Sequence, residues 1–268
     1  MKGDIVIVRG GGDIATGTIQ RLHRSGFRVL VLEIEKPTAI RRTVAVSNAV
    51  YEGEYEVEDF KSVKCDSELD IYLSWEKDLV PMAVDPKGDY IKILKPKYLV
   101  DAILAKKNIG FTEMKAAAKI ALGPGFTAGI DSDIVIETNR GHNLGRLIFT
   151  GTAAENTGVP GVIGGFAKER VIYSENSGKL KHIKKIGDLV KEGEIIAKIG
   201  EHEVTATIDG VLRGLINDGF EVEKGLKIAD IDPRKEEVKN CFTISDKARA
   251  IGGSVLEAIL ILKNEKNI

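Results

Sequence analysis

A glycine-rich turn near the start of the chain has the residues to bind a phosphate through its backbone. The motif GGGDIA at 10–15 follows the β-branched run IVIV at 5–8, and a segment with helical spacing of apolar residues comes next. In such a turn Gly10 allows the sharp bend, Gly12 lets a pyrophosphate approach the backbone, and Ala15 lets the helix pack closely on the strand. The unpaired amides of the first helical turn would then bind the anion.

An acid stands at the distance from this turn where a dinucleotide-binding unit needs one. Glu33 follows a second apolar run, at 29–32, and lies 21 residues after Gly12. A carboxylate there accepts a hydrogen bond from a ribose hydroxyl. Asp13 argues against phosphate binding at this turn, because a carboxylate that caps the helix competes with a phosphate for the same amides. The alternative to a ligand site is a tight strand–helix turn that binds nothing.

The GGGDxA turn nevertheless resembles nucleotide-binding loops of siroheme synthase-type dehydrogenases and of thioredoxin reductase-like flavoproteins. This resemblance makes Asp13 compatible with a bound nucleotide. The chain has no G-x-x-x-x-G-K-[ST] motif, which argues against a P-loop kinase or ATPase.

A second glycine-rich region, at 119–165, supplies further candidate ligand contacts. Glycine loses more entropy on ordering than any other residue, so a glycine-rich loop indicates a backbone that must approach something closely. Here GPGFTAG at 123–129 and TNRGHNLGR at 138–146 carry polar side chains that could form charge-assisted hydrogen bonds with an anion. We treat His142 both as a candidate ligand-binding or proton-transfer residue and as an ordinary turn residue. The complete set of predicted ligand-binding residues is Arg9, Gly10, Gly12, Asp13, Glu33, Gly123, Gly125, Arg140, His142 and Arg146.

One carboxylate stands inside an apolar run. Asp101 lies within a predicted strand at 98–104, where an unpaired charge costs on the order of several kcal/mol. We predict either a role at the end of the strand, near Lys106 or Lys107, or a structural ion pair.

Composition argues against several other kinds of site. Lys and Arg number 39 and Asp and Glu 40, and this balance argues against a nucleic-acid binder, which needs a basic surplus. The histidines show no metal-ligand spacing and the two cysteines form no Cys-x-x-Cys pair, so we predict no metal site. No apolar run is long enough for a bilayer, and the start does not read as a signal peptide. We therefore expect a cytoplasmic protein that does not bind membranes.

The elements that must position these residues begin with alternating strands and helices. Apolar strand-like runs lie at 5–8, 29–32, 80–84 and 98–104, and a helical segment separates the first two. This alternation predicts a Rossmann-like α/β domain with a parallel sheet over residues 1–168.

The second half of the chain contains an internal repeat. Residues 187–199 and 219–231 both read G-x-x-V-x-x-G-x-x-I-A-x-I, which is typical of short strands joined by turns. Residues 169–236 resemble the lipoyl/biotinyl-carrier β-sandwich, or barrel-sandwich hybrid, but the hairpin at 200–204 lacks the lysine that carriers modify. Residues 237–268 predict a C-terminal helix, over 245–263 and interrupted at Gly252-Gly253, that packs back on the α/β domain.

Six segments together are similar to the YqeB-type proteins of the selenium-dependent molybdenum hydroxylase system. They cover nearly the whole chain and read VRGGGDIATGTIQRLHRSGF, LEIEKPTAIRRTVA, LGPGFTAG, IETNRGHNLGR, NTGVPGVIGG and ISDKARAIGG. The resemblance implies a cytoplasmic accessory protein in the maturation of molybdenum-cofactor hydroxylases that also need labile selenium. It carries over no catalytic residue.

We therefore expect an accessory protein that binds a nucleotide, of the NAD or cytidine type, or a molybdopterin at its glycine-rich loops, with the client hydroxylase as its partner. One alternative is an NAD(P)-dependent oxidoreductase, in which Glu33 would favour NAD because a carboxylate repels the 2′-phosphate of NADP. Another is a non-enzymatic docking or scaffold protein whose glycines only form turns. Whether the protein is an enzyme stays open. The alternating segment at 51–64 offers an edge for pairing copies into a homo-oligomer.

Overall fold

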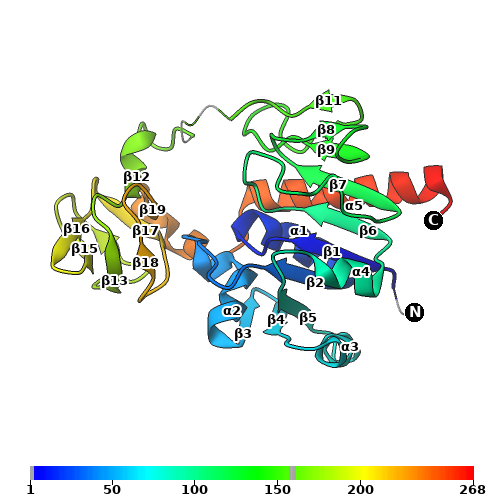
Figure 1. Ribbon diagram of the computed structural model, residues 1–268. Coiled ribbons are helices and arrows are strands. Elements are labelled where there is room, and N and C mark those ends of the chain that lie inside the picture. Colours follow the sequence, from blue (N-terminus) through cyan, green and yellow to red (C-terminus); the bar gives the residue numbers. More distant parts are fainter. Residues whose placement is uncertain (1–2, 157, 159–160) are drawn as a thin grey trace. The chain divides into compact units, whose positions relative to one another are not determined.

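The computed structural model describes residues 3–156, 158 and 161–268, and the chain divides into two compact units (Figure 1). Unit 1 comprises Met1–Pro37, Ala45–Thr157 and Ile244–Ile268. Unit 2 comprises Thr38–Val44 and Gly158–Thr243. Sequence alone placed the boundaries at residues 168 and 236 and did not assign residues 38–44 to the second unit.

Unit 1 is a mixed α/β structure built on a nine-stranded sheet of order β10-β9-β7-β6-β1-β2-β5-β4-β3. The seven inner strands pair in parallel, and the two edge strands, β10 and β3, pair antiparallel with their neighbours. A two-stranded sheet of β8 (Thr127–Ala128) and β11 (Gly151–Thr152) lies outside it. The large sheet contains β1 (Ile5–Arg9), β2 (Arg28–Glu33), β3 (Glu54–Val57), β4 (Phe60–Lys64), β5 (Val80–Val84), β6 (Tyr98–Asp101), β7 (Ala118–Leu122), β9 (Ile134–Ile136) and β10 (Leu147–Ile148).

The order of the strands reverses at β1. The chain moves from β1 to β2 and β5 on one side, then returns to β6, β7 and β9 on the other. The loops that follow β1 and β6 therefore separate at the carboxyl edge of the sheet, where open parallel sheets bind ligands. The helices of unit 1 are α1 (Asp13–Arg24), α2 (Ala49–Glu52), α3 (Glu68–Glu76), α4 (Asp89–Leu94) and α5 (Asp246–Lys266), with a 3₁₀ turn η2 at Val46–Asn48.

The C-terminal helix α5 crosses α1 with direct backbone contact (Figure 1). A Cβ atom added to Gly17 would lie 2.4 Å from the Ala248 carbonyl oxygen, and one added to Gly252 would lie 2.4 Å from the Gly17 carbonyl oxygen. The predicted interruption at Gly252-Gly253 is wrong, because α5 is continuous through both residues. The close crossing of α1 and α5 requires a glycine at position 252. Ser245 caps α5, because its side chain accepts a hydrogen bond from the Ala248 amide.

Helix α5 runs between the carboxyl ends and the amino ends of the strands in the sheet of unit 1. At its far end the Lys266 ammonium donates to the Ala117 carbonyl and to Asp133, which precede β7 and β9. Those positions lie at the amino edge of the sheet, so the first turn of α5 lies at the carboxyl edge, beside the first turn of α1.

Unit 2 consists of two four-stranded antiparallel sheets, of order β12-β19-β17-β14 and β16-β15-β13-β18. Each copy of the repeat gives a short strand to one sheet and a long strand to the other: β14 and β15 from the first copy, β18 and β19 from the second. The shared apolar positions, among them Val190, Ile196, Val222 and Ile228, are buried in one core. The strands are β12 (Val171–Tyr173), β13 (Gly178–His182), β14 (Leu189–Val190), β15 (Ile195–Ile199), β16 (His202–Thr205), β17 (Gly210–Leu215), β18 (Glu221–Val222) and β19 (Lys227–Asp232), with 3₁₀ turns η1 (Arg42–Val44), η3 (Lys168–Arg170) and η4 (Lys235–Cys241).

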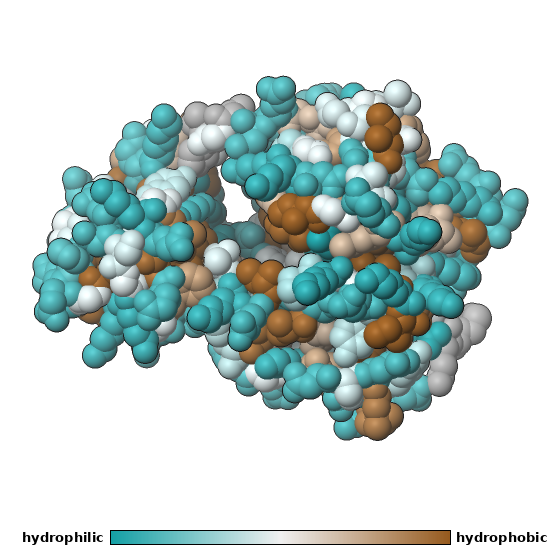
Figure 2. All heavy atoms as spheres, viewed as in Figure 1, coloured by the Kyte–Doolittle hydropathy of each residue, from teal (hydrophilic) through white to brown (hydrophobic). Residues whose placement is uncertain are grey.

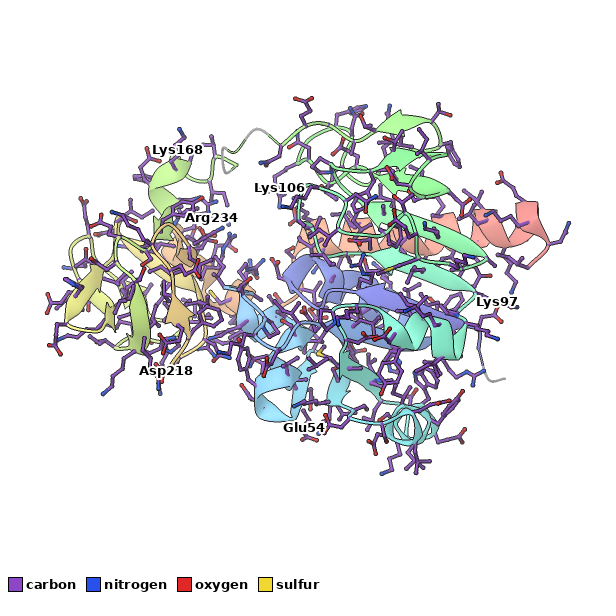
Figure 3. The ribbon with its side chains drawn as sticks, in the orientation of Figure 1. Glu54, Lys97, Lys106, Lys168, Asp218 and Arg234 are labelled. Carbon is purple, nitrogen blue, oxygen red and sulfur yellow. The ribbon has the colours of Figure 1, made fainter. Side chains whose placement is uncertain are left out.

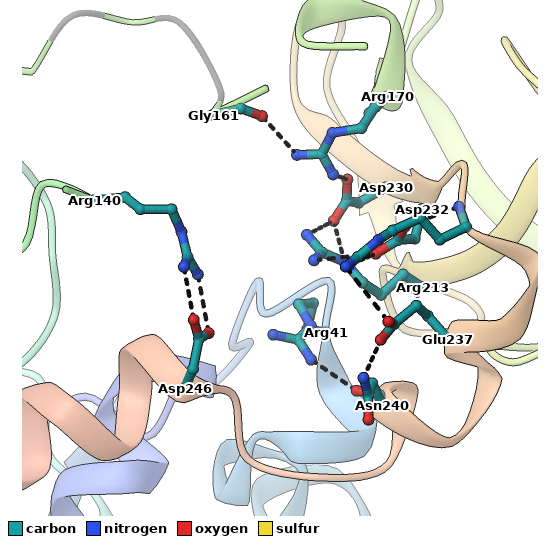
Figure 4. Close-up of polar contacts among 11 residues, drawn as sticks. Arg41, Arg140, Gly161, Arg170, Arg213, Asp230, Asp232, Glu237, Asn240 and Asp246 are labelled. Carbon is teal, nitrogen blue, oxygen red and sulfur yellow. Dashed lines mark hydrogen bonds and ion pairs between the residues drawn. The ribbon is translucent and has the colours of Figure 1, made fainter. Parts of the chain in front are cut away.

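A buried network of arginines and acids joins the segments of unit 2 (Figure 4). The Asp230 carboxylate, 2% exposed, accepts from Arg170 at 3.1 Å and also from Arg213. Asp232 accepts from Arg234 at 2.8 Å. These arginines serve internal ion pairs, so they tie η3 and β17 to β19.

Neither a membrane-spanning helix nor a cluster of metal ligands occurs among the described residues. None of the helices in 3–156, 158 and 161–268 has the length and apolar character needed for a bilayer span. Within the same residues, no three His, Cys, Asp or Glu side chains are placed to hold a metal ion. Both cysteines, Cys65 and Cys241, are free and buried, and burial raises the pKa of each thiol above its usual value.

Candidate functional site

Two of the three glycines in the turn after β1 are required by the fold itself. Gly10 has a φ of +93°, and a Cβ atom there would lie 3.0 Å from the Ala102 carbonyl oxygen. A Cβ atom on Gly11 would lie 3.1 Å from the Ser47 amide nitrogen and from the end of the Met82 side chain. The turn therefore packs tightly against the segments after β6 and before α2, whether or not it binds a ligand.

The third glycine has no such reason within the chain. Gly12 has φ −66° and ψ 179°, a conformation open to any residue, and an added Cβ atom would meet nothing within 4 Å. Gly12 is also the N-cap of α1 and provides no side chain to the amides of the first turn. A glycine at this position keeps the space beside the helix N-terminus open, which a phosphate needs and the fold does not.

Asp13 does not cap the helix, contrary to the competition expected from the sequence. It is the first residue of α1, one position after the N-cap. A carboxylate in the first turn interacts favourably with the helix dipole. Asp13 therefore adds a negative charge to the end of the helix where a phosphate would bind.

Glu33 ends β2 directly beside the glycine turn. Its Oε1 atom accepts from the Gly11 amide at 2.7 Å, and its Oε2 atom accepts from the Ile34 amide at 2.9 Å. Burial raises the pKa of Glu33 above its ordinary value, although both amide hydrogen bonds act in the opposite direction. The structure thus brings Gly10, Gly12, Asp13 and Glu33 together, as the motif predicted.

Arg9 and Asp101 form a buried ion pair under this turn. They lie opposite each other on β1 and β6, with Nη1 of Arg9 2.6 Å from Oδ2 of Asp101, and their side chains are 5% and 3% exposed. Arg9 also donates to the Ile109 carbonyl at 3.0 Å. Of the two alternatives predicted for Asp101, the structural ion pair is therefore confirmed, and its partner is Arg9. The pair fixes the ends of two strands at the point where the strand order reverses.

Gly123 and Gly125 follow β7 and bring loops of the same edge together. A Cβ atom on Gly123 would lie 2.6 Å from Oγ1 of Thr138, and one on Gly125 would lie 2.6 Å from the backbone of Lys107. Their φ values are +78° and +100°. The close approach inferred from this glycine-rich sequence is thus made, at these two positions, by the chain to itself.

The loop after β9 carries the remaining predicted residues. Arg140 makes two hydrogen bonds, of 2.7 and 3.0 Å, with Asp246 at the start of α5 (Figure 4). This contact holds the pKa of Asp246 far below its usual range. His142 and Arg146 are exposed on the same loop. All ten predicted residues thus lie in or next to loops at the carboxyl edge of one sheet.

Lys247 is a candidate residue that the sequence prediction missed. It stands in the first turn of α5, half-buried, and faces the charges of Asp13, Glu137 and Asp246 as well as that of Arg140. Burial, as the largest cause, lowers the pKa of its ammonium. The Ser245 cap marks where this helix begins, but only the crossing with α1 brings Lys247 beside the glycine turn. Its ammonium lies within electrostatic range of Asp13, the first residue of α1.

The chain is similar to a protein of Escherichia coli (strain K12) named "Uncharacterized protein YqeB". The two are 51% identical over 261 residues, which are 97% of this chain and 48% of the E. coli protein. The chain therefore spans about half the length of this relative, and the similarity supports the YqeB-type resemblance across nearly all of the sequence. A scan against models of protein families finds no match.

Similarity to solved structures is low. The product-bound ectoine utilization protein EutE (DoeB) from Ruegeria pomeroyi has a TM-score of 0.26 and 10% identity, with 85% of each chain covered. The succinylglutamate desuccinylase/aspartoacylase from Rhodobacter sphaeroides has a TM-score of 0.27 and 15% identity, over 86% of this chain and 85% of that one. Scores at this level do not establish a common fold.

Proposed function

We propose that unit 1 binds a nucleotide or a molybdopterin-type ligand, with its phosphates on the amides at the start of α1. Gly12 carries this proposal, because its conformation and surroundings do not require a glycine. Apart from β3 and β4 at one side of the sheet and β10 at the other, the strand order β5-β2-β1-β6-β7-β9 corresponds to the 3-2-1-4-5-6 order of dinucleotide-binding sheets, which supports a Rossmann-like domain. In such sheets the phosphates lie on the turn after the first strand.

The neighbouring side chains suit the two ends of such a ligand. Glu33 would accept a hydrogen bond from a ribose hydroxyl, since each carboxylate oxygen keeps a further lone pair beyond its amide contact. Lys247 would balance the phosphate charge together with the amides. These residues bind and orient a ligand, and none of them is assigned a bond-breaking role.

The cellular role that we propose is accessory: maturation of a selenium-dependent molybdenum hydroxylase. It rests on the YqeB-type resemblance, and the ligand would then be a pterin or cytidine nucleotide of the molybdenum cofactor. We propose that unit 2 is a carrier-like β-sandwich that docks the client hydroxylase, since the β15–β16 hairpin at Gly200–Glu201 has no lysine to modify.

Deleting the gene should abolish hydroxylase activity while the hydroxylase polypeptide stays abundant. Normal activity in the deletion strain would contradict this role.

Thermal denaturation with a panel of ligands tests the binding proposal. NAD(H), NADP(H), CTP, GTP and molybdopterin dinucleotides are each added to the purified protein. A ligand at 100 times its dissociation constant adds about 2.7 kcal/mol to the free energy of unfolding, which gives a clear rise in melting temperature. A rise with a pterin or cytidine ligand supports the maturation role. No rise with any of them contradicts the ligand site and leaves the docking or scaffold function.

A second candidate function is that of an oxidoreductase that uses NAD. Glu33 favours NAD over NADP, because a carboxylate repels the 2′-phosphate of NADP. Because its folded-state pKa is raised, Glu33 takes up a proton at a higher pH than a free glutamate does. Affinity for NAD should therefore fall as the pH drops through this raised pKa, since a protonated carboxyl accepts poorly. Titration calorimetry of NAD against pH should show this fall in the parent protein and none in Glu33→Gln. The same pH dependence in both proteins would exclude Glu33 as the ribose contact.

A further inference from the structure

A cavity lies in unit 1, away from the glycine turn. It measures about 790 Å³ and lies between α4 and the segment 110–117. Lys97 and Ala117, which line it, directly precede β6 and β7 at the amino edge of the sheet. Figure 3 shows Lys97 at this edge and Lys106, beside Gly125, at the opposite one. The volume is in the range of pockets that enclose small organic ligands.

The cavity exists because the connection from β6 to β7 contains no helix. Residues 102–117 cross the sheet as an irregular segment, with the backbone of Leu104, Lys106 and Gly110 in the left-handed region. Phe111, fully buried, fixes this segment to the core. A helix would pack along α4, whereas this segment leaves the space open beside Ile91.

The floor of the cavity is apolar and its rim is basic. Ile91 is buried, and the half-buried Met114 and Ala116 pack on the same hydrophobic core. Figure 2 shows hydrophobic patches set among hydrophilic side chains on the surface of the molecule. The charged residues of the lining are five lysines and a single acid: Lys87, Lys92, Lys95, Lys97, Lys115 and Glu113.

Two of the five lysines are in ion pairs, and Lys87 lies within electrostatic range of Asp89. Lys92 pairs with Asp89 and Lys97 pairs with Asp4. Among the residues that the structure describes, Lys87, Lys95 and Lys115 make no ion pair within 4.0 Å. The chain as a whole has a net charge of −1, so a local surplus of lysines over an apolar floor calls for an anionic ligand.

We propose that this cavity binds a small amphipathic anion, with an apolar body and a phosphate, sulfonate or carboxylate head. The body lies against Ile91, Met114 and Ala116, where it loses contact with water. The head meets the ammonium groups of Lys87, Lys95 and Lys115 at the rim. This site is independent of the nucleotide proposed at the carboxyl edge.

Two fluorescent probes of similar shape test the proposal on the full chain. 1-Anilinonaphthalene-8-sulfonate carries an anionic head, and N-phenyl-1-naphthylamine is its neutral counterpart. The triple variant K87Q/K95Q/K115Q should weaken binding of the sulfonate at least tenfold and that of the neutral probe less than twofold. Ala117→Trp, an exposed position in the lining, should fill the space and weaken both probes at least tenfold.

A matched triple variant of exposed lysines in unit 2, K179Q/K224Q/K239Q, controls for the change in net charge and should leave both affinities unchanged. Circular dichroism and melting temperature establish that each variant is folded. Equal affinity of the sulfonate for the parent protein, the rim variant and Ala117→Trp would overturn the proposal. Co-sedimentation with phosphatidylglycerol vesicles, without binding of the free sulfonate, would also overturn it, because the surface would then recognise a membrane.

Discussion

Gly12→Asp is expected to stabilise the folded protein slightly and to abolish nucleotide binding. The N-cap position has room for the new side chain, which meets nothing within 4 Å at its Cβ atom. Aspartate is a preferred N-cap and interacts well with the helix dipole, so we expect the free energy of unfolding to rise by up to about 1 kcal/mol. The same carboxylate occupies the amides and the space that a phosphate would use, and it repels the phosphate charge. We expect affinity to fall at least about 100-fold, or about 2.7 kcal/mol.

The opposite signs of these two effects make the variant informative. Titration calorimetry with the ligand that gives the largest thermal shift measures the affinity, and melting temperature measures the stability. Gly253→Ala is the control, because it alters a glycine of α5 whose added Cβ atom would meet nothing within 4 Å. Unchanged affinity in Gly12→Asp would mean that the ligand does not use the start of α1.

The neighbouring glycines of α5 should respond in opposite directions to the same substitution. In Gly252→Ala the new methyl group would lie 2.4 Å from the carbonyl oxygen of Gly17, a backbone atom that cannot move without α1. Overpacking of this kind typically costs 1–3 kcal/mol, and we expect about 3 kcal/mol here because the contact is with backbone. In Gly253→Ala the methyl group meets nothing, so the better helix propensity of alanine should add about 0.5–1 kcal/mol.

Urea unfolding followed by tryptophan fluorescence measures both variants. Trp75 is the only tryptophan of the chain, and its indole donates to the Val29 carbonyl on β2 at 2.8 Å, so its signal reports unit 1. Equal stability of Gly252→Ala and Gly253→Ala would show that α1 and α5 do not cross in backbone contact. A loss in Gly253→Ala alone would place a different face of α5 on α1.

Features that depend on residues close together in the chain could be predicted from the sequence. The run at 5–8, the glycine turn and the acid at position 33 are close in the chain, and their order predicted the unit β1–α1–β2. The repeat at 187–199 and 219–231 likewise predicted short strands joined by turns, because each copy carries its own turn glycines and apolar positions, and each copy forms two strands.

Features that depend on contacts between residues far apart in the chain could not be predicted from the sequence. Arg9 pairs with Asp101, 92 positions away, because β6 lies beside β1 in the sheet. Gly125 is needed by the backbone of Lys107, and Lys247 reaches the glycine turn only through the crossing of α5 over α1. The sequence therefore predicted which loops share the carboxyl edge of the sheet, but it could not separate glycines required by packing from Gly12, which packing leaves unexplained.

The most direct test of the nucleotide site is an NMR titration of the ¹⁵N-labelled protein with NAD⁺, CTP and a molybdopterin dinucleotide in turn. The structure predicts that the ligand which binds shifts the backbone amides of residues 11–15 most strongly, with smaller shifts at Glu33 and Lys247. Binding with the largest shifts elsewhere, or saturating concentrations that move none of these amides, would contradict a phosphate site at the start of α1.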